Sequence, residues 1–243
     1  MIDPTRRAPD PRDNQLLAAL PDAAWARWQP HLEPVDLAVG QVLCESGNSP
    51  AFVIFPTTAI VSLLYVTRDG ATAEVAVVGN DGVVGISLVM GGNATPSQAV
   101  VQSAGQGYRL RAQAVKNEVQ QAGPVLQMLL RYAQDLIAQV AQTAACNRYH
   151  SIDQLMCRRL LMGLDRSTSD ELVMTHELLA NLLGVRREGV TAAAHRLQQA
   201  GAIRYSRGRI VVVDRQGLEM RSGVCHTLAG KNLGRLQALP LAA

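Results

Sequence analysis

The stretch from Arg186 to Arg209 contains six arginines and one acidic residue, Glu188. A guanidinium group can donate hydrogen bonds to O6 and N7 of guanine or pair with a phosphate oxygen, and a carboxylate can accept one from N4 of cytosine. This density of arginines therefore points to a polyanionic partner, with double-stranded DNA as the candidate. The six are Arg186, Arg187, Arg196, Arg204, Arg207 and Arg209.

Two short helices joined by a tight turn are expected to carry the first of these arginines. Thr175 is a good N-cap, and Glu177 places a negative charge near the positive end of the first helix. Gly184 can adopt a positive φ and ends that helix, and a second helix follows at once. This is the helix-turn-helix unit, whose second helix lies in the major groove and contacts bases with its N-terminal residues. The apolar positions are Leu178, Leu179, Leu182, Leu183, Val190, Ala193, Ala194 and Leu197.

A β-hairpin with a basic tip is expected after the second helix, which Gly201 ends. A strand that begins at Ile203 turns at residues 206–209, and the β-branched run 210–213 returns. Such a hairpin is a wing, and its arginines would lie against phosphates. The alternative is a small helical domain with a solvated basic face. We assign DNA backbone contacts to Thr175, His176, Arg186, Ser206, Arg207 and Arg209. A solvated surface position is the alternative for each, above all for His176 and Arg209, and it stays open for Arg186.

Residues 175–191 read Thr-x-Glu-x-x-Ala-x-x-Leu-Gly-Val-x-Arg-Glu-x-Val-Thr, and Leu-x-x-Ala-Gly-x-Ile and the wing follow. This pattern resembles the DNA-binding domain of the Crp/Fnr family of bacterial transcription regulators. The resemblance implies a homodimer on a near-palindromic operator, with Arg187, Glu188 and Thr191 as base contacts. A further base-reading position, an arginine in some members, is Ala192 here, so the preferred DNA sequence should differ from theirs. Family members often contact RNA polymerase, a further partner that the resemblance implies.

The distribution of charge agrees with a DNA-binding C-terminal half. Residues 147–243 hold 14 basic and 8 acidic side chains, whereas residues 1–146 hold 9 and 12. Cys44, Cys146, Cys157 and Cys225 show no metal-ligand spacing and are expected to be free thiols in a reducing cytosol. No apolar run reaches membrane-spanning length and no signal peptide opens the chain, so we expect a cytoplasmic protein without a membrane partner.

The N-terminal half is expected to be an antiparallel β-roll behind a leading helix over residues 16–28. Short β-type runs alternate with glycine-rich turns, which is typical of a sandwich or roll. It also looks like the sensor of the Crp/Fnr family, which has the cyclic-nucleotide-binding fold. The candidate strands are 41–44, 51–55, 60–66, 73–78, 83–87, 99–102 and 108–111.

A long helix is predicted from Pro124 through Cys146, with one continuous apolar stripe. A helix longer than its own roll requires can bury such a stripe against a second copy of the chain. The alternative is a core helix packed within its own subunit; in the family, the corresponding helix forms the dimer interface. The interface residues we assign are Leu126, Leu129, Leu130, Ala133, Leu136, Ile137, Val140 and Ala144. Residues 147–150 are the expected hinge, and Ser151 and Gln154 form a capping box for the next helix.

The sensor lacks the residues that hold a cyclic nucleotide in family members. Their phosphate cassette resembles Gly-Glu-Leu/Ile-Ala/Gly, followed by Arg-Ser/Thr-Ala, in which the arginine pairs with the phosphate and the glutamate with a ribose hydroxyl. Residues 85–88 and 97–99 align with these positions and contain neither the acid nor the arginine. Cyclic AMP is therefore not expected as a ligand in the familiar mode, and the effector is not identified.

Cofactor and enzyme classes find no support in the sequence. Four scattered cysteines do not suit an iron–sulfur cluster, and residues 39–111 contain no histidine for a haem or for a facial metal triad. We expect no cofactor, no metal site and no catalysis.

The expected architecture is α+β. It comprises a mobile tail (1–14), a β-roll sensor with its leading helix (15–123), a dimerisation helix (124–147), a winged helix-turn-helix (148–220) and a C-terminal extension (221–243). The expected function is sequence-specific transcription regulation. The alternative is a small-molecule sensor or protein-interaction module whose winged helix contacts protein.

Overall fold

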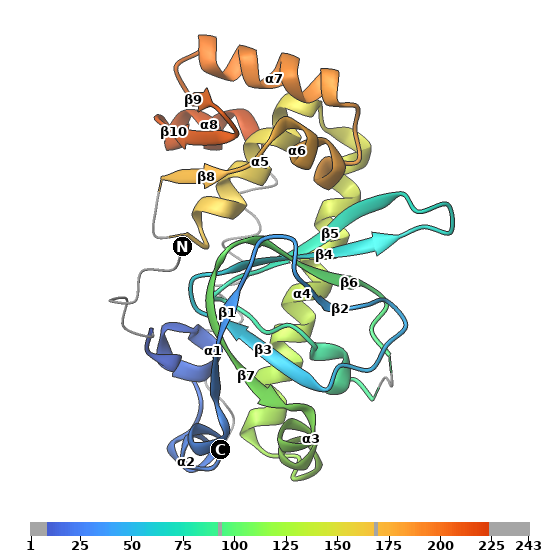
Figure 1. Ribbon diagram of the computed structural model, residues 1–243, viewed down its shortest axis with the longest axis vertical. Helices are drawn as coiled ribbons and strands as arrows, with labels where there is room; N and C mark the ends of the chain where they lie inside the picture. The colour runs from blue at the N-terminus through green and yellow to red at the C-terminus, as the bar shows by residue number, and fades with distance from the viewer. Residues whose placement is uncertain (1–8, 92–93, 168–169, 224–243) are drawn as a thin grey trace. The chain divides into compact units, whose positions relative to one another are not determined.

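The computed structural model describes residues 9–91, 94–167 and 170–223, and the chain divides into two compact units. One unit comprises residues 1–61 and 78–130, and the other comprises residues 62–77 and 131–243. Helices and antiparallel strands occur in both units, so the expected α+β class is confirmed (Figure 1).

Two sheets form the roll. The first has the order β1-β7-β3 and is antiparallel, with strands Glu33–Leu37, Gly105–Arg111 and Phe52–Pro56. The second has the order β2-β6-β4-β5, with strands Val42–Cys44, Gln98–Ser103, Ile60–Val66 and Thr72–Val78. In β3, Val53 and Phe55 are almost fully covered, and Phe52 and Ile54 are less buried. The predicted roll is thus confirmed as a fold.

In the roll, one strand prediction was wrong and one strand was missed. The segment 83–87 is not a strand: Val84 makes one bridge to Ile54, and the chain then turns at Gly85 into the 3₁₀ helix η3, Ile86–Leu88. The strand β1 was not predicted; it contains Pro34, a residue type that usually interrupts a strand. β1 is an edge strand, where a missing backbone N–H is tolerated.

The N-terminal segment also differs from the prediction. The leading helix is broken at Pro21 into α1, Gln15–Ala18, and α2, Asp22–Trp28; the 3₁₀ helix η2, Gln29–His31, follows. Residues 9–14 are not a tail, because η1, Pro11–Asp13, leads to a fully buried Asn14. The Asn14 side chain caps α1 and donates hydrogen bonds to two carbonyl oxygens of the roll. Residues 1–8 of the predicted tail lie outside the described residues.

The long helix α4, Pro124–Tyr149, follows α3, Ala112–Gln120, and runs three residues beyond its predicted end. Its apolar residues fall into two groups. Leu129 and Ala133 are buried within the chain itself, whereas Leu130 and Ile137 are 47% and 59% exposed and Val140 is also exposed. Most of the predicted hinge is helical, and the break lies at residues 150–151.

The winged-helix part begins with α5, Ile152–Leu164, whose predicted capping box between Ser151 and Gln154 is present. The strand β8, Glu171–Val173, the helices α6, His176–Leu183, and α7, Arg187–Gln199, and the strands β9, Ile203–Ser206, and β10, Arg209–Val212, follow in order. The last described helix is α8, Arg215–Ser222, and the remainder of the predicted C-terminal extension lies outside the described residues. One apolar core unites these elements, with Leu160, Leu179, Val190 and Ile210 fully buried.

The thiols of Cys44 and Cys157 are free, and burial raises the pKa of Cys157 to about 11. Cys146 is buried, and Cys225 lies outside the described residues. In the described part of the chain, no helix combines the length and apolarity needed to cross a membrane. Among the same residues, no three His, Cys, Asp or Glu side chains gather to hold a metal ion.

Candidate nucleic-acid interface

The turn between α6 and α7 has the geometry that its sequence predicts. The Thr175 hydroxyl accepts a hydrogen bond from the N–H of Leu178 and caps α6. Gly184 has a φ of 65°, and the N–H of Val185 donates to the carbonyl oxygen of Ala180, which closes the end of α6. The helix α7 therefore starts two residues later, at Arg187; Figure 1 shows α6 and α7 joined by this turn.

The helix α7 presents its predicted base contacts to solvent. Arg187, Glu188 and Thr191 are exposed, as is Ala192, whereas the opposite face is buried in the core. Arg186 occupies the N-cap position and makes no side-chain cap. The first turn of α7 thus offers a guanidinium, a carboxylate and free backbone N–H groups on one exposed surface.

The helix α5 holds α7 in place through two contacts that the sequence did not indicate. A Cβ at Gly189 would lie 2.6 Å from Cδ1 of Ile152, so glycine allows the close approach of the two helices. Farther along, Arg196 pairs with Asp153 through two hydrogen bonds, of which Nε to Oδ2 measures 2.8 Å. This pair lowers the pKa of Asp153, because the guanidinium favours the charged carboxylate. Arg196 is therefore a structural residue of the α5–α7 contact.

The wing is a hairpin with a two-residue turn, in which Arg207 and Gly208 have φ values of 48° and 77°. Positive φ at both positions is the signature of a type I′ turn, which matches the twist of the strands. The carbonyl oxygen of Gly208 accepts a hydrogen bond from the N–H of Met174. The tip of the wing, with its exposed Arg207, consequently lies next to the N-terminus of α6.

A third strand, β8, completes the wing sheet in the order β8-β10-β9 and was not predicted from the sequence. The signal was present, because buried Leu172 and Met174 alternate with the more exposed Glu171 and Val173. The same period of two would have placed Arg204 on the exposed side of β9, between buried Ile203 and half-buried Tyr205. Arg204 is thus a candidate DNA contact that had no assigned role.

The six arginines differ in their partners. Arg196 pairs with Asp153, and Arg209 pairs with Glu171 on the neighbouring strand. The other four are Arg186, Arg187, Arg204 and Arg207. None of them forms an ion pair with any residue in the described part of the chain. Since these side chains are exposed, they are available to phosphates or bases. Arg209 must first leave Glu171, although an exposed pair of this kind holds only weakly.

His176 connects α6, α7 and the wing. Its ring stacks on Tyr205 with a centroid distance of 4.2 Å, and its Nδ1 lies 3.0 Å from the Thr191 hydroxyl. The Thr191 hydroxyl donates its single proton to the carbonyl oxygen of Arg187, so the neutral imidazole must donate from Nδ1. Burial, and then the positive charge of Arg187, lower the pKa of His176. Thr191 remains exposed, but its hydroxyl is already engaged.

The segment that aligns with the cyclic-nucleotide cassette keeps a tight turn and lacks charge. Gly85 has a φ of 99° and precedes η3, and a Cβ there would lie 3.3 Å from a Val53 methyl group. No lysine, arginine, histidine, aspartate or glutamate occurs between residues 82 and 108. This part of the roll therefore offers backbone and neutral polar groups to any ligand.

Residues 155–221 match a family model described as the Crp-like helix-turn-helix domain. A search of curated proteins found no match. Among solved structures, a protein from Eubacterium rectale described as a Crp/Fnr-family transcriptional regulator is similar, at 19% identity and a TM-score of 0.67, over 87% of this chain and 99% of that one. FixK2 from Bradyrhizobium japonicum has 14% identity and a TM-score of 0.67, over 79% and 98%. A CRP-family regulator from Thermus thermophilus has 19% identity and a TM-score of 0.64, over 78% and 96%.

Proposed function

We propose that this chain is a Crp/Fnr-type transcriptional regulator that binds a near-palindromic operator as a homodimer; its Crp-like helix-turn-helix domain and its fold support this proposal. The observation that carries the proposal is the exposed first turn of α7, where Arg187 and Glu188 are free of core packing. Three more exposed arginines, at the N-cap of α7 and in the wing, have no ion-pair partner among the described residues: Arg186, Arg204 and Arg207. The protein acts by binding and not by catalysis.

The base-reading roles follow from the chemistry of the exposed groups. Arg187 donates to O6 and N7 of a guanine, and Glu188 accepts from a cytosine N4. Arg186, Arg207 and the helix N-termini near Thr175 and His176 fix the register on the phosphates. Because Ala192 provides no hydrogen-bonding group, the operator differs from those of relatives with arginine at that position.

The dimer forms along α4. Leu130, Ile137 and Ala144 recur every seven residues and are exposed, and Val140 adds to the same stripe. Apolar residues at this spacing form the seam of a parallel helix pair. We exclude Leu129 and Ala133 from the proposed interface, because both are buried within the chain itself. The half-buried Leu126 and Leu136 flank it.

The proposed regulator does not use cyclic AMP in the mode of its nucleotide-binding relatives. A bound phosphate without a cation would lose its solvation without compensation, which costs several kcal/mol. The uncharged segment 82–108 supports this part of the proposal.

The function is tested by selecting bound sequences from random duplex DNA and measuring affinity by fluorescence anisotropy. Ile137→Asp places a charge in the dimer seam and should give monomers by light scattering, with a loss of operator affinity of about 100-fold or more because avidity disappears. Ala138→Asp is the matched control, since this exposed residue lies about 100° around the helix. A protein that dimerises but selects no DNA at low salt would refute the proposal and favour a protein-binding winged helix.

A further inference from the structure

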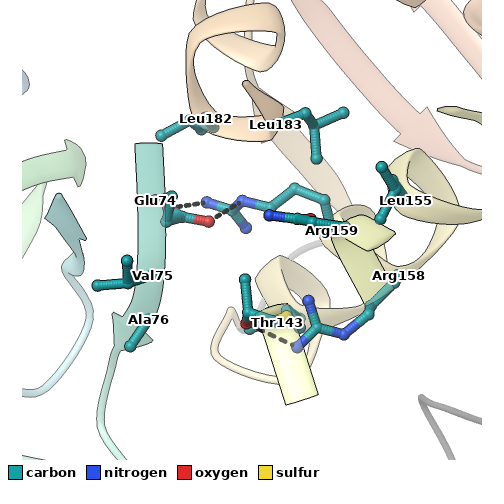
Figure 2. Close-up of a pocket in the computed structure, with 11 residues that line it drawn as sticks. Glu74, Val75, Ala76, Thr143, Leu155, Arg158, Arg159, Leu182 and Leu183 are labelled. Atoms are coloured by element: carbon teal, nitrogen blue, oxygen red, sulfur yellow. Dashed lines mark hydrogen bonds and ion pairs between the residues drawn. The ribbon is translucent and has the colours of Figure 1, made fainter. Parts of the chain in front are cut away.

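A buried ion pair joins the sensor sequence to the DNA-binding sequence inside one compact unit. The outer part of the β4–β5 hairpin, residues 62–77, groups with residues 131–223; we call it the hairpin arm. On the arm, the carboxylate of Glu74 faces Arg159 of α5, with Oε1 and Nε 2.7 Å apart (Figure 2). Their side chains are only 7% and 3% exposed. The pair is therefore shielded from water and salt.

The carboxylate of Glu74 has further contacts. Ser62, also on the arm and buried, donates its hydroxyl proton to Oε2 at 2.5 Å, and Nη2 of Arg159 lies 3.2 Å from the same oxygen. Leu182 and Leu183 of α6 line the hollow around the pair (Figure 2). Glu74 thus contacts Ser62 on the arm and Arg159 on α5, and leucines of α6 line the same hollow.

The arm is fastened to the dimerisation helix as well. The N–H of Val77 donates to Oε1 of Gln139 on α4 at 2.6 Å. Next to the pair, Arg158 donates to the hydroxyl of Thr143, also on α4, at 3.2 Å. The arm and the C-terminal part of α4 therefore form one support on which α5 is held.

Helix α5 transmits this position to the recognition helix. Ile152 of α5 packs at Gly189, and Asp153 of α5 pairs with Arg196 of α7. The position of α5 therefore determines the position of α7. Burial lowers the pKa of Arg159, and the charge of Glu74 opposes that shift. A buried ion pair is seldom a net gain in stability over apolar residues, but it is strongly orientation-dependent. Such a contact is suited to holding α5 in one orientation on the hairpin arm.

We propose that Glu74 is a positioning residue for DNA recognition, whose carboxylate holds Arg159 and thereby fixes α5 and α7 on the hairpin arm. The inference rests on the proposed DNA-binding function. Without the carboxylate, α5 and α7 sample several positions and only a fraction of molecules is competent to bind. The apparent Kd rises by the inverse of that fraction.

The test uses the full-length protein and the selected operator. Glu74→Gln keeps the size of the side chain and removes its charge, and we expect operator affinity to fall about tenfold. Ser62→Ala leaves the ion pair and removes only the hydroxyl contact, so it should lose about two- to fivefold. Ser62→Ala also keeps the test decisive if Glu74→Gln does not fold.

Hydrogen exchange supplies a readout that a purely structural role would not move. Because coupling is reciprocal, operator binding should slow the exchange of amides in residues 62–77 of the wild type and leave them unchanged in Glu74→Gln. Glu118→Gln is the matched control: Glu118 is 8% exposed, pairs with Arg27 and belongs to the other unit. It should bind the operator as the wild type does.

The outcomes separate the two proposals. Folded, dimeric Glu74→Gln and Ser62→Ala proteins with wild-type operator affinity would overturn the positioning role and leave the DNA-binding function intact. An equal loss in Glu118→Gln would overturn it too, since the effect would then follow general destabilisation. A wild-type protein that selects no DNA would overturn the function, and this inference with it.

Discussion

The helix-turn-helix with its wing and the segment aligned with the cyclic-nucleotide cassette each contain a glycine turn, but they differ in side-chain chemistry. Gly184 adopts a positive φ before α7, and Gly85 adopts one before η3. The stretch 186–209 carries six arginines, whereas residues 82–108 carry no charged side chain. A glycine turn is thus compatible with a charged surface in one region and a neutral one in the other. Function is argued from the side chains that a fold presents, and not from the fold.

The largest expected effect within the helix-turn-helix and wing is that of Arg187→Ala. Loss of a bidentate contact to guanine should cost about 1–3 kcal/mol of operator affinity and relax the preference at one base pair. Anisotropy titrations against operators mutated at each position measure both quantities. A variant with unchanged affinity and unchanged selectivity would remove α7 from the base-reading role.

Arg207→Asn should have a smaller and sequence-independent effect. Asparagine tolerates the positive φ at this position, so the turn is retained while the charge is lost. We expect weaker binding to operator and random DNA alike, with a slope of log affinity against log salt that is smaller by about one. Weakening confined to the operator would indicate a base contact in place of a phosphate contact.

A pH series addresses His176. Its pKa is lowered in the free protein, so the imidazole is neutral there near pH 7. A nearby phosphate favours the charged form and raises the pKa, so DNA binding takes up a proton and affinity should rise as the pH falls from about 7.5 to 6, by at most about tenfold per pH unit. His176→Asn retains a side-chain N–H donor and should flatten this dependence. A wild-type affinity that is flat over the same range would place His176 away from phosphate.

The segment aligned with the cyclic-nucleotide cassette should not bind cyclic AMP. A calorimetric titration with cyclic AMP should show no binding heat, because residues 82–108 provide no cation for the phosphate. Micromolar binding would show that neutral groups suffice and would remove the contrast between the two regions.

The winged helix was predictable because its signals are local. The Thr175 cap, the Gly184 turn and the capping box at Ser151 act within a few residues, and all three are present. Along the roll, patterns of the same kind indicated most of the strands. These patterns failed at β1, because a proline such as Pro34 is compatible both with the end of an element and with an edge strand.

Contacts between residues far apart in the sequence could not be predicted from its patterns. Glu74 and Arg159 are 85 positions apart, and neither belongs to a motif. The partners of Arg196 and Arg209 were equally hidden, so the sequence pattern did not distinguish among the six arginines. Hydrophobic spacing on α4 showed the stripe, but it did not separate Leu129, which is buried within the chain, from exposed Leu130.

In helix α7, the residues that pack in the core are different from those that are exposed. Val190, Ala193, Ala194 and Leu197 anchor it, while Arg187, Glu188 and Ala192 lie on its open side. Under the proposed function, substitutions at the outer positions would leave the buried anchor untouched and change the preferred operator sequence. On that proposal, sequence specificity and folding stability depend on different residues of one helix, so specificity can change one exposed position at a time.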